Sequence, residues 1–179
     1  KLTRCPEGHV VPAAQPLRDD PIDLAHANWS QRGWGEAAGG MAVVTSIMRV
    51  QQVLLARVEA ILRPLGLTFA RYEVLMLLLF SRSGCLPVGK IGERLQVHPA
   101  SVTNAVHRLE QDGFVVRSAN PADGRSVLAE ITPRGRKLAE RATALLNAQV
   151  FSLVPIPPDE QQDVYSTLKG LRHAFGDFL

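Results

Sequence analysis

Residues 87–135 read PVGKIGERLQVHPASVTNAVHRLEQDGFVVRSANPADGRSVLAEITPRG, and this stretch decides the fold. Its first part carries apolar residues three and four apart, which predicts a short helix containing Val88, Ile91 and Leu95. His98-Pro99 then interrupts the chain, because proline suits the first turn of a helix and disfavours helix in the residue before it. We therefore expect a second helix to begin at Pro99.

The second predicted helix covers residues 99–112 and has two chemically different faces. Val102, Val106 and Leu109 form its apolar face, and Gly113 supplies a C-cap. The side chains of the opposite face can all form hydrogen bonds and none is acidic: Ser101, Thr103, Asn104, His107 and Arg108. Two helices joined by a tight turn, with a polar face on the second, are typical of a helix-turn-helix, whose second helix enters the DNA major groove.

A two-stranded hairpin is predicted after the second helix. Residues 114–117 and 126–131 are rich in strand-forming side chains, and residues 120–124 between them form a turn cluster. The hairpin tip carries Arg125, two residues after Asp123. An arginine on a narrow ribbon can enter the minor groove of DNA, and a nearby carboxylate can hold its guanidinium in place. We expect this arrangement here; an ordinary solvated turn residue is the alternative for Arg125.

The motifs SVTNAVHRLEQDGFVVR, DGR and LAEITPRGR resemble the winged helix-turn-helix of MarR-type transcriptional regulators, and the likeness covers residues 40–175 or so. The resemblance implies a homodimeric regulator that binds a palindromic operator, often as a repressor that a small ligand releases. The residues then expected to contact double-stranded DNA are Lys90, Pro99, Ser101, Thr103, Asn104, His107, Arg108, Asp123 and Arg125.

The chain before this stretch begins with a segment that has no apolar periodicity. Residues 1–20 contain three prolines, and we expect them to form a flexible arm. Asp20 followed by Pro21 is the pattern of an N-cap and a first helical turn, and Gly33 and Gly35 close the short helix that they begin. This helix is expected to dock on the body of the dimer, either as a packing clip or with Trp29 or Trp34 as a wall of a ligand pocket.

Longer helices are predicted on both sides of the helix-turn-helix. Residues 41–65 carry an apolar stripe, and Thr68 caps a following helix that is apolar on all sides. Thr132-Pro133 begins another helix after the hairpin, and a last helix follows Pro158. The hairpin is too small to cover these stripes, so we expect them to pack against the same helices of a second copy.

The predicted fold class is therefore mainly α with a small β wing, in which a winged helix-turn-helix DNA-binding lobe is joined to a helical dimerisation region. A dimer would set its two recognition helices about 34–36 Å apart, which is one turn of DNA. The expected divisions are a flexible N-terminal arm (1–20), the N-terminal helices of the dimerisation region (21–66), the DNA-binding lobe (67–134) and the C-terminal dimerisation helices (135–179).

The net charge of +3 is unevenly distributed along the chain. Residues 87–141 carry nine basic and six acidic side chains, whereas residues 142–179 carry two and four. This modest excess favours a dimer, which doubles the phosphate contacts. The longest uninterrupted apolar run, residues 74–80, is shorter than a membrane span, and no secretory signal pattern is evident. We expect a cytoplasmic protein without a membrane partner.

Catalytic and metal-binding motifs are missing from the sequence. It has no glycine-rich phosphate loop, no nucleophile elbow and no paired-histidine motif, so we expect neither enzymatic activity nor a metal or cofactor. Two cysteines, Cys5 and Cys85, exclude a disulfide framework. Two alternatives to a ligand-responsive DNA-binding regulator remain: a winged-helix module that binds protein, and a regulator that senses oxidants through a cysteine thiol.

The additional N-terminal helix with Trp29 resembles the urate-responsive branch of the same family. That branch pairs its tryptophan with an aspartate and two arginines. Arg117 matches one arginine and Glu73 keeps the acidic charge, but Ala105 replaces the other arginine, which disfavours urate itself. The expected ligand-binding residues are Trp29, Arg49, Glu73 and Arg117, for an aromatic or anionic effector or a CoA thioester. A phosphate contact at the base of the wing is the simpler role for Arg117.

Overall fold

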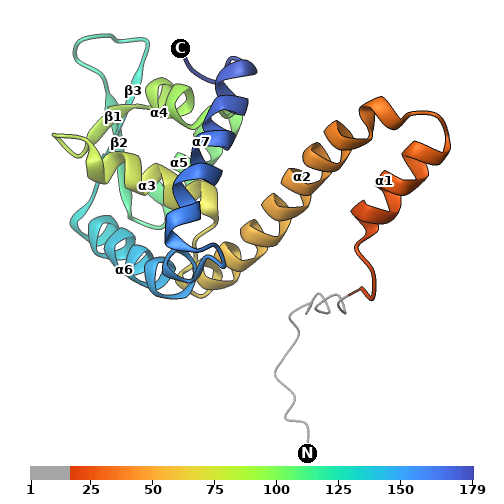
Figure 1. Cartoon of the computed structure of the whole chain (residues 1–179). Helices are drawn as coiled ribbons and strands as arrows, with labels where there is room; N and C mark the ends of the chain where they lie inside the picture. Colours follow the sequence, from red (N-terminus) through yellow and green to blue (C-terminus); the bar gives the residue numbers. More distant parts are fainter. Residues whose placement is uncertain (1–16) are drawn as a thin grey trace, which may run out of the picture. The chain divides into compact units, whose positions relative to one another are not determined.

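The computed structural model describes residues 17–179, so Cys5 and most of the predicted arm lie outside the described residues. Contacts divide the chain into two compact units, residues 1–53 and 54–179, and the boundary falls inside α2 (Figure 1). The elements are α1 (Pro21–Gln31), α2 (Gly35–Leu62), α3 (Phe69–Phe80), β1 (Cys85–Pro87), α4 (Val88–Leu95), α5 (Pro99–Gln111), β2 (Val115–Ala119), β3 (Val127–Ile131), α6 (Pro133–Gln149) and α7 (Pro158–Ala174), with short 3-10 turns at Arg63–Leu65 and Phe151–Leu153.

The helix-turn-helix lies where the sequence predicted it. α4 buries Ile91 completely, and α5 begins at Pro99 and buries its apolar face. α5 ends at Gln111, one residue before the predicted end, and Asp112 is its C-cap. Gly113 follows with a φ of 73°, a left-handed conformation that glycine adopts without steric cost.

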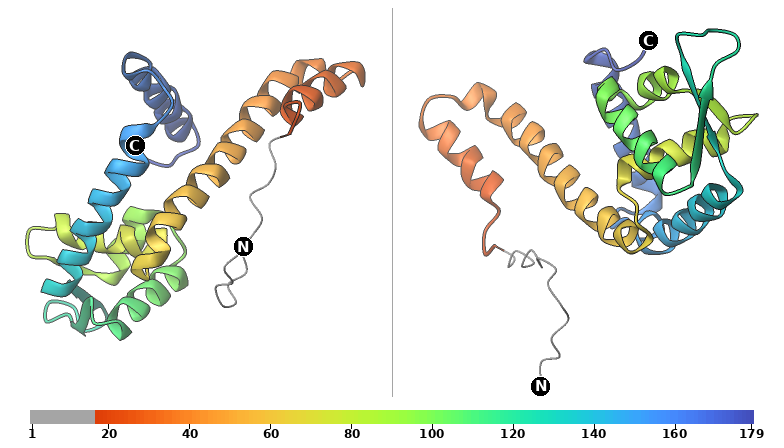
Figure 2. Two further views of the ribbon diagram at one scale, coloured as in Figure 1. Left: turned by 90° about the horizontal axis from the view of Figure 1, so that it is seen from below. Right: turned by 180° about the vertical axis from the view of Figure 1, so that it is seen from behind.

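The sheet has three antiparallel strands in the order β1-β3-β2, whereas the sequence predicted only the β2–β3 hairpin. Figure 2 shows this hairpin as a narrow ribbon with a projecting loop. The added strand β1 pairs Cys85 with Glu130 and Pro87 with Leu128. A three-residue edge strand that contains proline has no periodicity to reveal it, because pairing with β3 alone defines it.

One hydrophobic core holds the second unit together. α3 lies at its centre, as its apolar sequence predicted, and buries Val74, Leu75 and Leu78. The same core includes Leu109 of α5 and Leu146 of α6. The recognition helix and the base of the wing therefore pack into the same hydrophobic core within this unit.

Side-chain caps fix the helix starts that the sequence predicted. Asp20 Oδ1 accepts a hydrogen bond from the backbone N–H of Ile22 at 2.8 Å. Thr68 caps α3, and Thr132 Oγ1 accepts from the N–H of Gly135 at 3.0 Å. Such caps satisfy N–H groups that have no partner inside the helix, so they locate a helix start by local chemistry.

The prediction for residues 33–41 was wrong in one respect, because α2 begins at Gly35 and not at residue 41. Trp34, in the turn before α2, lies edge to face with Trp29 of α1, with ring centroids 5.3 Å apart. α2 then continues through Gly39 and Gly40. Glycine weakens a helix by about 1 kcal/mol relative to alanine, and this cost does not end a helix that apolar residues continue.

α2 and α7 expose apolar faces. Residues Gly35–Leu65 are long and apolar enough to pass a length-and-composition test for a membrane span, with a mean hydropathy of 1.3, although the sequence has no uninterrupted apolar run of that length. A helix of a soluble protein whose apolar face packs on another chain has the same length and composition. The exposed residues are Val43, Val44, Met48, Val50, Val53, Leu54 and Leu55 on α2, and Val164, Tyr165 and Leu168 on α7.

Candidate nucleic-acid interface

The recognition helix α5 turns its predicted polar face to solvent. Ser101, Thr103, Asn104, His107 and Arg108 are all exposed. The opposite face is 0–8% exposed at every apolar position. This division leaves the outward side chains available to a partner while the inward ones fix the orientation of the helix.

One hydroxyl group and one imidazole near the start of α5 already have local hydrogen-bond partners. Thr103 Oγ1 donates to the carbonyl oxygen of Pro99 at 2.9 Å, so only its lone pairs and methyl group face outward. His98 Nδ1 accepts from the backbone N–H of Ala100 at 3.2 Å, which makes this histidine the N-cap of α5. Lys90 lies exposed on the neighbouring helix α4.

The wing tip is ordered by its own side chains, and Asp123 differs from the prediction. Its Oδ1 accepts from the backbone N–H of Arg125 at 3.1 Å, whereas the sequence predicted a contact with the guanidinium. Asn120 accepts from the N–H of Ala122 at 3.0 Å and donates to Ser126 Oγ at 2.8 Å. A short aspartate in a turn reaches the backbone two residues on more readily than a distant guanidinium. Asp123 thus shapes the loop that presents Arg125.

Arg117 forms the tightest ion pair near the recognition helix. Its Nε donates to Glu110 Oε2 at 2.7 Å, its Nη2 lies 2.6 Å from the same oxygen, and His107 Nδ1 lies 3.5 Å from Nη2. The hydrogen bond from Arg117 lowers the pKa of Glu110, because it stabilises the ionised carboxylate. This pair ties β2 to α5, and an anion at Arg117 would have to displace a carboxylate.

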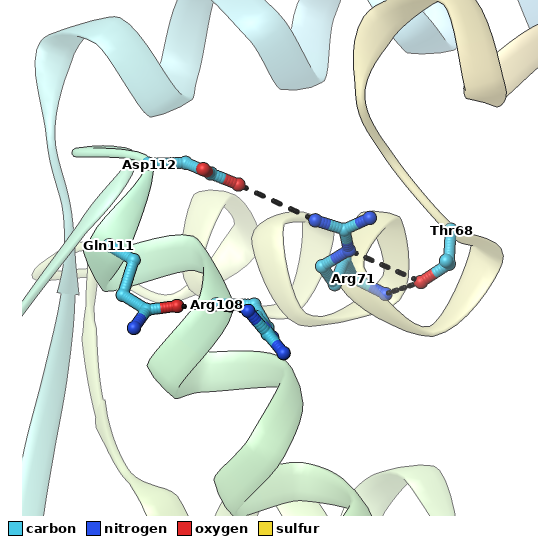
Figure 3. Close-up of polar contacts among 5 residues, drawn as sticks. All are labelled: Thr68, Arg71, Arg108, Gln111 and Asp112. Atoms are coloured by element: carbon cyan, nitrogen blue, oxygen red, sulfur yellow. Dashed lines mark hydrogen bonds and ion pairs between the residues drawn. The ribbon is translucent and has the colours of Figure 1, made fainter.

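Two of the surface cavities of the second unit lie along α5. A cavity of about 280 Å³ lies on the wing side and is lined in part by Thr103, Arg117 and Arg125. A larger cavity of about 570 Å³ lies between α5 and the start of α3 (Figure 3). The residues that line the larger cavity are Thr68, Ala70, Arg71, Ser101, Asn104, Ala105, Arg108, Gln111 and Asp112.

Sequence reasoning missed Arg71 and Asp112, which meet in the larger cavity. Arg71 Nη1 lies 3.4 Å from Asp112 Oδ2, although the residues are 41 positions apart. No local pattern signals such a pair, since only the packing of α3 against α5 brings it together. Arg108, the predicted DNA-contacting residue beside them, donates to Gln111 at 3.3 Å.

The four predicted ligand-binding residues fall in different places. Trp29 and Arg49 belong to the first unit, whereas Glu73 and Arg117 belong to the second. Glu73 is half-buried on α3, and burial raises the pKa of its carboxyl. Glu73 is not among the residues that line the cavity containing Arg117.

Cys85 has the chemistry of a structural thiol. Burial raises its pKa, and the carboxylate of Glu130 on the paired strand raises it further. A raised pKa depletes the thiolate, which is the reactive form. Within residues 17–179, no group of three or more histidine, cysteine or acidic side chains could hold a metal ion.

Comparison with known proteins identifies a single family. The sequence profile of the MarR family matches residues 67–127. The HTH-type transcriptional repressor Rv2887 of Mycobacterium tuberculosis is 38% identical over 102 residues, which cover 57% of this chain and 72% of the relative. The match therefore extends over most of the relative's length.

Solved structures agree with the sequence matches. Sco5413, a MarR family transcriptional regulator of Streptomyces coelicolor, is 52% identical with a TM-score of 0.72, and the alignment covers 78% of this chain and 97% of that chain. CouR of Rhodococcus jostii RHA1, solved with p-coumaroyl-CoA bound, is 28% identical with a TM-score of 0.65, and the alignment covers 76% and 94% of the two chains.

Proposed function

This chain belongs to the MarR family of transcriptional regulators, and we propose that it acts as a homodimeric, ligand-responsive repressor bound to a palindromic operator. The family and its relatives identify a DNA-binding regulator with a winged helix-turn-helix and not an enzyme. One observation carries the DNA-binding part of the proposal: the polar face of α5 is exposed to solvent, while its apolar face is buried in the core. The proposed location is the cytoplasm, where the operator is.

We propose that α5 enters the major groove with Pro99 at its leading end. Asn104 carries an amide that can pair with adenine, and Arg108 carries a guanidinium suited to guanine or phosphate. Lys90 on α4 would contact phosphates and Arg125 the minor groove, on a loop shaped by Asp123. The remaining proposed contacts are those of Ser101, Thr103 and His107 with base edges or the adjacent backbone.

Removal of the wing arginine tests the DNA-binding proposal. Arg125→Ala should weaken binding to duplexes selected from a random pool by at least about tenfold, because a charged contact is lost in each subunit. Arg32→Ala, in the loop after α1, serves as the control and should leave affinity unchanged. Fluorescence anisotropy at several salt concentrations gives both the affinity and its salt slope. A wild-type protein whose binding ignored salt would contradict the proposal and favour the protein-binding alternative.

Replacement of a single base-reading residue gives a finer test. Asn104→Ala should relax sequence preference at one position in each half-site, with a loss of about 1–3 kcal/mol in discrimination. The salt slope should stay the same, since a base contact releases no counterions. Repeating the selection with the variant protein measures the change; an unaltered consensus would remove Asn104 from the readout.

We propose that the exposed apolar faces of α2 and α7 are covered by a second copy of the chain. α2 exposes seven large apolar residues, and α7 exposes three more near the other end of the chain. Isologous pairing buries both faces of both copies at once. Sedimentation in detergent-free buffer separates the possibilities: a stable dimer supports the proposal, whereas a requirement for detergent would indicate a lipid-facing helix.

We propose an aromatic or anionic effector, or a CoA thioester, as the regulating ligand. CouR supplies the support, because its structure contains p-coumaroyl-CoA. An effector releases DNA only to the extent that it prefers the conformation that does not bind DNA. Competition with labelled duplex tests p-coumaroyl-CoA, p-coumarate and urate. Release by none of them would reject this ligand class, and loss of DNA binding on peroxide treatment that Cys85→Ser abolishes would instead support the thiol alternative.

A further inference from the structure

We propose that the cavity between α3 and α5 is a phosphate clamp, in which Arg71 and Arg108 together bind one phosphodiester of the DNA backbone. In the free protein the carboxylate of Asp112 holds Arg71, and the phosphate takes its place on binding. This inference rests on the proposed DNA-binding function. It adds to that function a DNA contact from α3, outside the recognition helix and the wing.

The geometry of the two arginines shows that their present partners are weak. Arg71 Nε lies 3.4 Å from Thr68 Oγ1 and its Nη1 lies 3.4 Å from Asp112 Oδ2 (Figure 3). Arg108 Nη1 donates to Gln111 Oε1, a neutral acceptor, at 3.3 Å. Charge-assisted hydrogen bonds of an arginine are about 2.7–2.9 Å long, so all three contacts are loose. A phosphate can therefore replace them at little cost.

The contrast with Arg117 supports this assignment. Arg117 binds Glu110 at 2.7 Å through Nε, a distance expected of a satisfied ion pair. Arg71, in the same unit, is only 21% exposed at its side chain yet makes no comparably short contact. An arginine whose side chain is mostly buried but whose guanidinium is loosely paired is ready to bind a stronger anion.

Charge and position favour a DNA phosphate in this cavity. Two guanidinium groups and one carboxylate line it, so it carries a net positive charge. Ser101 and Asn104 line the same cavity and also belong to the outward face of α5. A helix inserted in the major groove has a phosphate backbone along each side, so the cavity would lie against one strand when α5 reads the bases.

Asp112 fits the role of a displaceable partner. It is the C-cap of α5, and a negative charge is unfavourable at the C-terminal end of a helix. Its side chain is 48% exposed, so the released carboxylate returns to water. Exposed ion pairs contribute little to stability, which leaves Arg71 free to change partners.

The salt dependence of DNA binding by the full-length dimer tests the clamp. Arg71→Ala should weaken binding to selected duplexes about tenfold and reduce the salt slope by about 0.9 for each subunit, since one phosphate contact is lost. Asp112→Asn should tighten binding several-fold, because it removes the competing carboxylate. Arg141→Ala, at an exposed position of α6, is the matched control and should change neither quantity.

A neutral backbone substitution locates the contact. In a set of duplexes, each carries one neutral methylphosphonate at a different position of the backbone. The wild type should bind more weakly to the duplex in which the methylphosphonate replaces the phosphate held by the clamp, once in each half-site. Arg71→Ala should show no further loss at that phosphate, and thermal unfolding checks that the variant is folded. Where Arg71→Ala proves unfolded, Arg71→Lys replaces it; it keeps the charge and should retain the salt slope while losing affinity.

Three results would overturn the inference. The first is an unchanged salt slope in Arg71→Ala, and the second is a methylphosphonate penalty that is the same in the variant and the wild type. The third is DNA binding by Arg71→Ala that is as tight as that of the wild type, which would leave the cavity without a role in DNA affinity. If the wild type itself binds no duplex, the proposed function fails; if only these differences are absent, the clamp alone fails.

Discussion

The two units of this protein differ in how much of their apolar surface they bury. In the second unit, α3, α5, α6 and the sheet bury one another, and Leu75, Leu78 and Leu109 are fully inaccessible. Among the described residues of the first unit, only Ala38 is buried, while α2 exposes valine and methionine along its length. One unit therefore carries its own core, whereas the other exposes an apolar surface, which a second copy covers in the proposed dimer. The orientation of the recognition helix is therefore fixed by packing within one chain, whereas in the proposed dimer the distance between two recognition helices depends on how the copies associate.

The largest expected effect comes from a charge on the exposed face of α2. Met48 is 61% exposed, and Met48→Glu would place an unpaired carboxylate in the proposed dimer interface of both copies. We expect dimer affinity to fall by at least roughly a hundredfold, with the second unit still folded. Sedimentation equilibrium and circular dichroism measure the two properties. Gln52→Glu, at an exposed polar site, is the control. If the wild type, Met48→Glu and Gln52→Glu dimerised equally well, the exposed face of α2 would not be the dimer interface.

A substitution that creates a cavity in the core of the second unit should have the next largest effect. Leu75→Ala should lower the free energy of unfolding by about 2–5 kcal/mol, because it removes buried methyl groups and the surroundings refill the space only partly. Val50→Ala on exposed α2 should cost less than about 1 kcal/mol in the same transition. Urea unfolding followed by circular dichroism measures both. Similar losses would show that Val50 is buried in the folded protein, as it would be against a second copy of the chain.

Two glycines sharpen the same contrast. A methyl group on Gly135 would overlap the carbonyl oxygen of Phe114, so Gly135→Ala should cost about 1–3 kcal/mol. Gly40, inside α2, has no atom within 4 Å of that position, and Gly40→Ala should gain up to about 1 kcal/mol of helix stability. Thermal unfolding of the two variants should shift in opposite directions. Destabilisation by Gly40→Ala would mean that a second copy packs closely against that glycine.

The smallest expected effect concerns the ion pair that ties the wing to the recognition helix. The hydrogen bond from Arg117 lowers the pKa of Glu110, so the pair stabilises the fold above the ordinary glutamate pKa of 4.5, and this stability is lost as pH falls through the lowered value. Glu110→Gln should therefore be less stable than the wild type at pH 7 and equal to it in strong acid. Urea midpoints at several pH values measure the difference. A constant gap across that range would assign the loss to packing.

The parts of the fold that the sequence predicted are those with local causes. Caps at Asp20, Thr68 and Thr132 act within three residues, and the apolar spacing of α5 repeats within one helix. The polar face of that helix follows from the same spacing, because the apolar side chains alone decide which side is buried. The family resemblance, carried by the same residues, was confirmed by the comparisons.

The features that the sequence did not predict depend on residues far apart in the chain. β1 exists because residues 85–87 pair with β3, and Asp123 turned out to bind the backbone of its own loop. Arg117, predicted to meet a ligand or a phosphate, is held by Glu110. DNA contacts themselves stay predictions for the residues of α5 and the wing.

By itself, the amino-acid sequence determined the capped helix starts, the helix-turn-helix, the β2–β3 hairpin and the outward polar face, since each follows from spacing over a few residues. Tertiary structure alone decided which charges have partners: it placed Arg71 beside Asp112 across 41 positions and Arg117 beside Glu110 across the edge of the wing. The physical reason is that hydrogen bonds and ion pairs act over a few ångströms of space, whatever the distance along the chain.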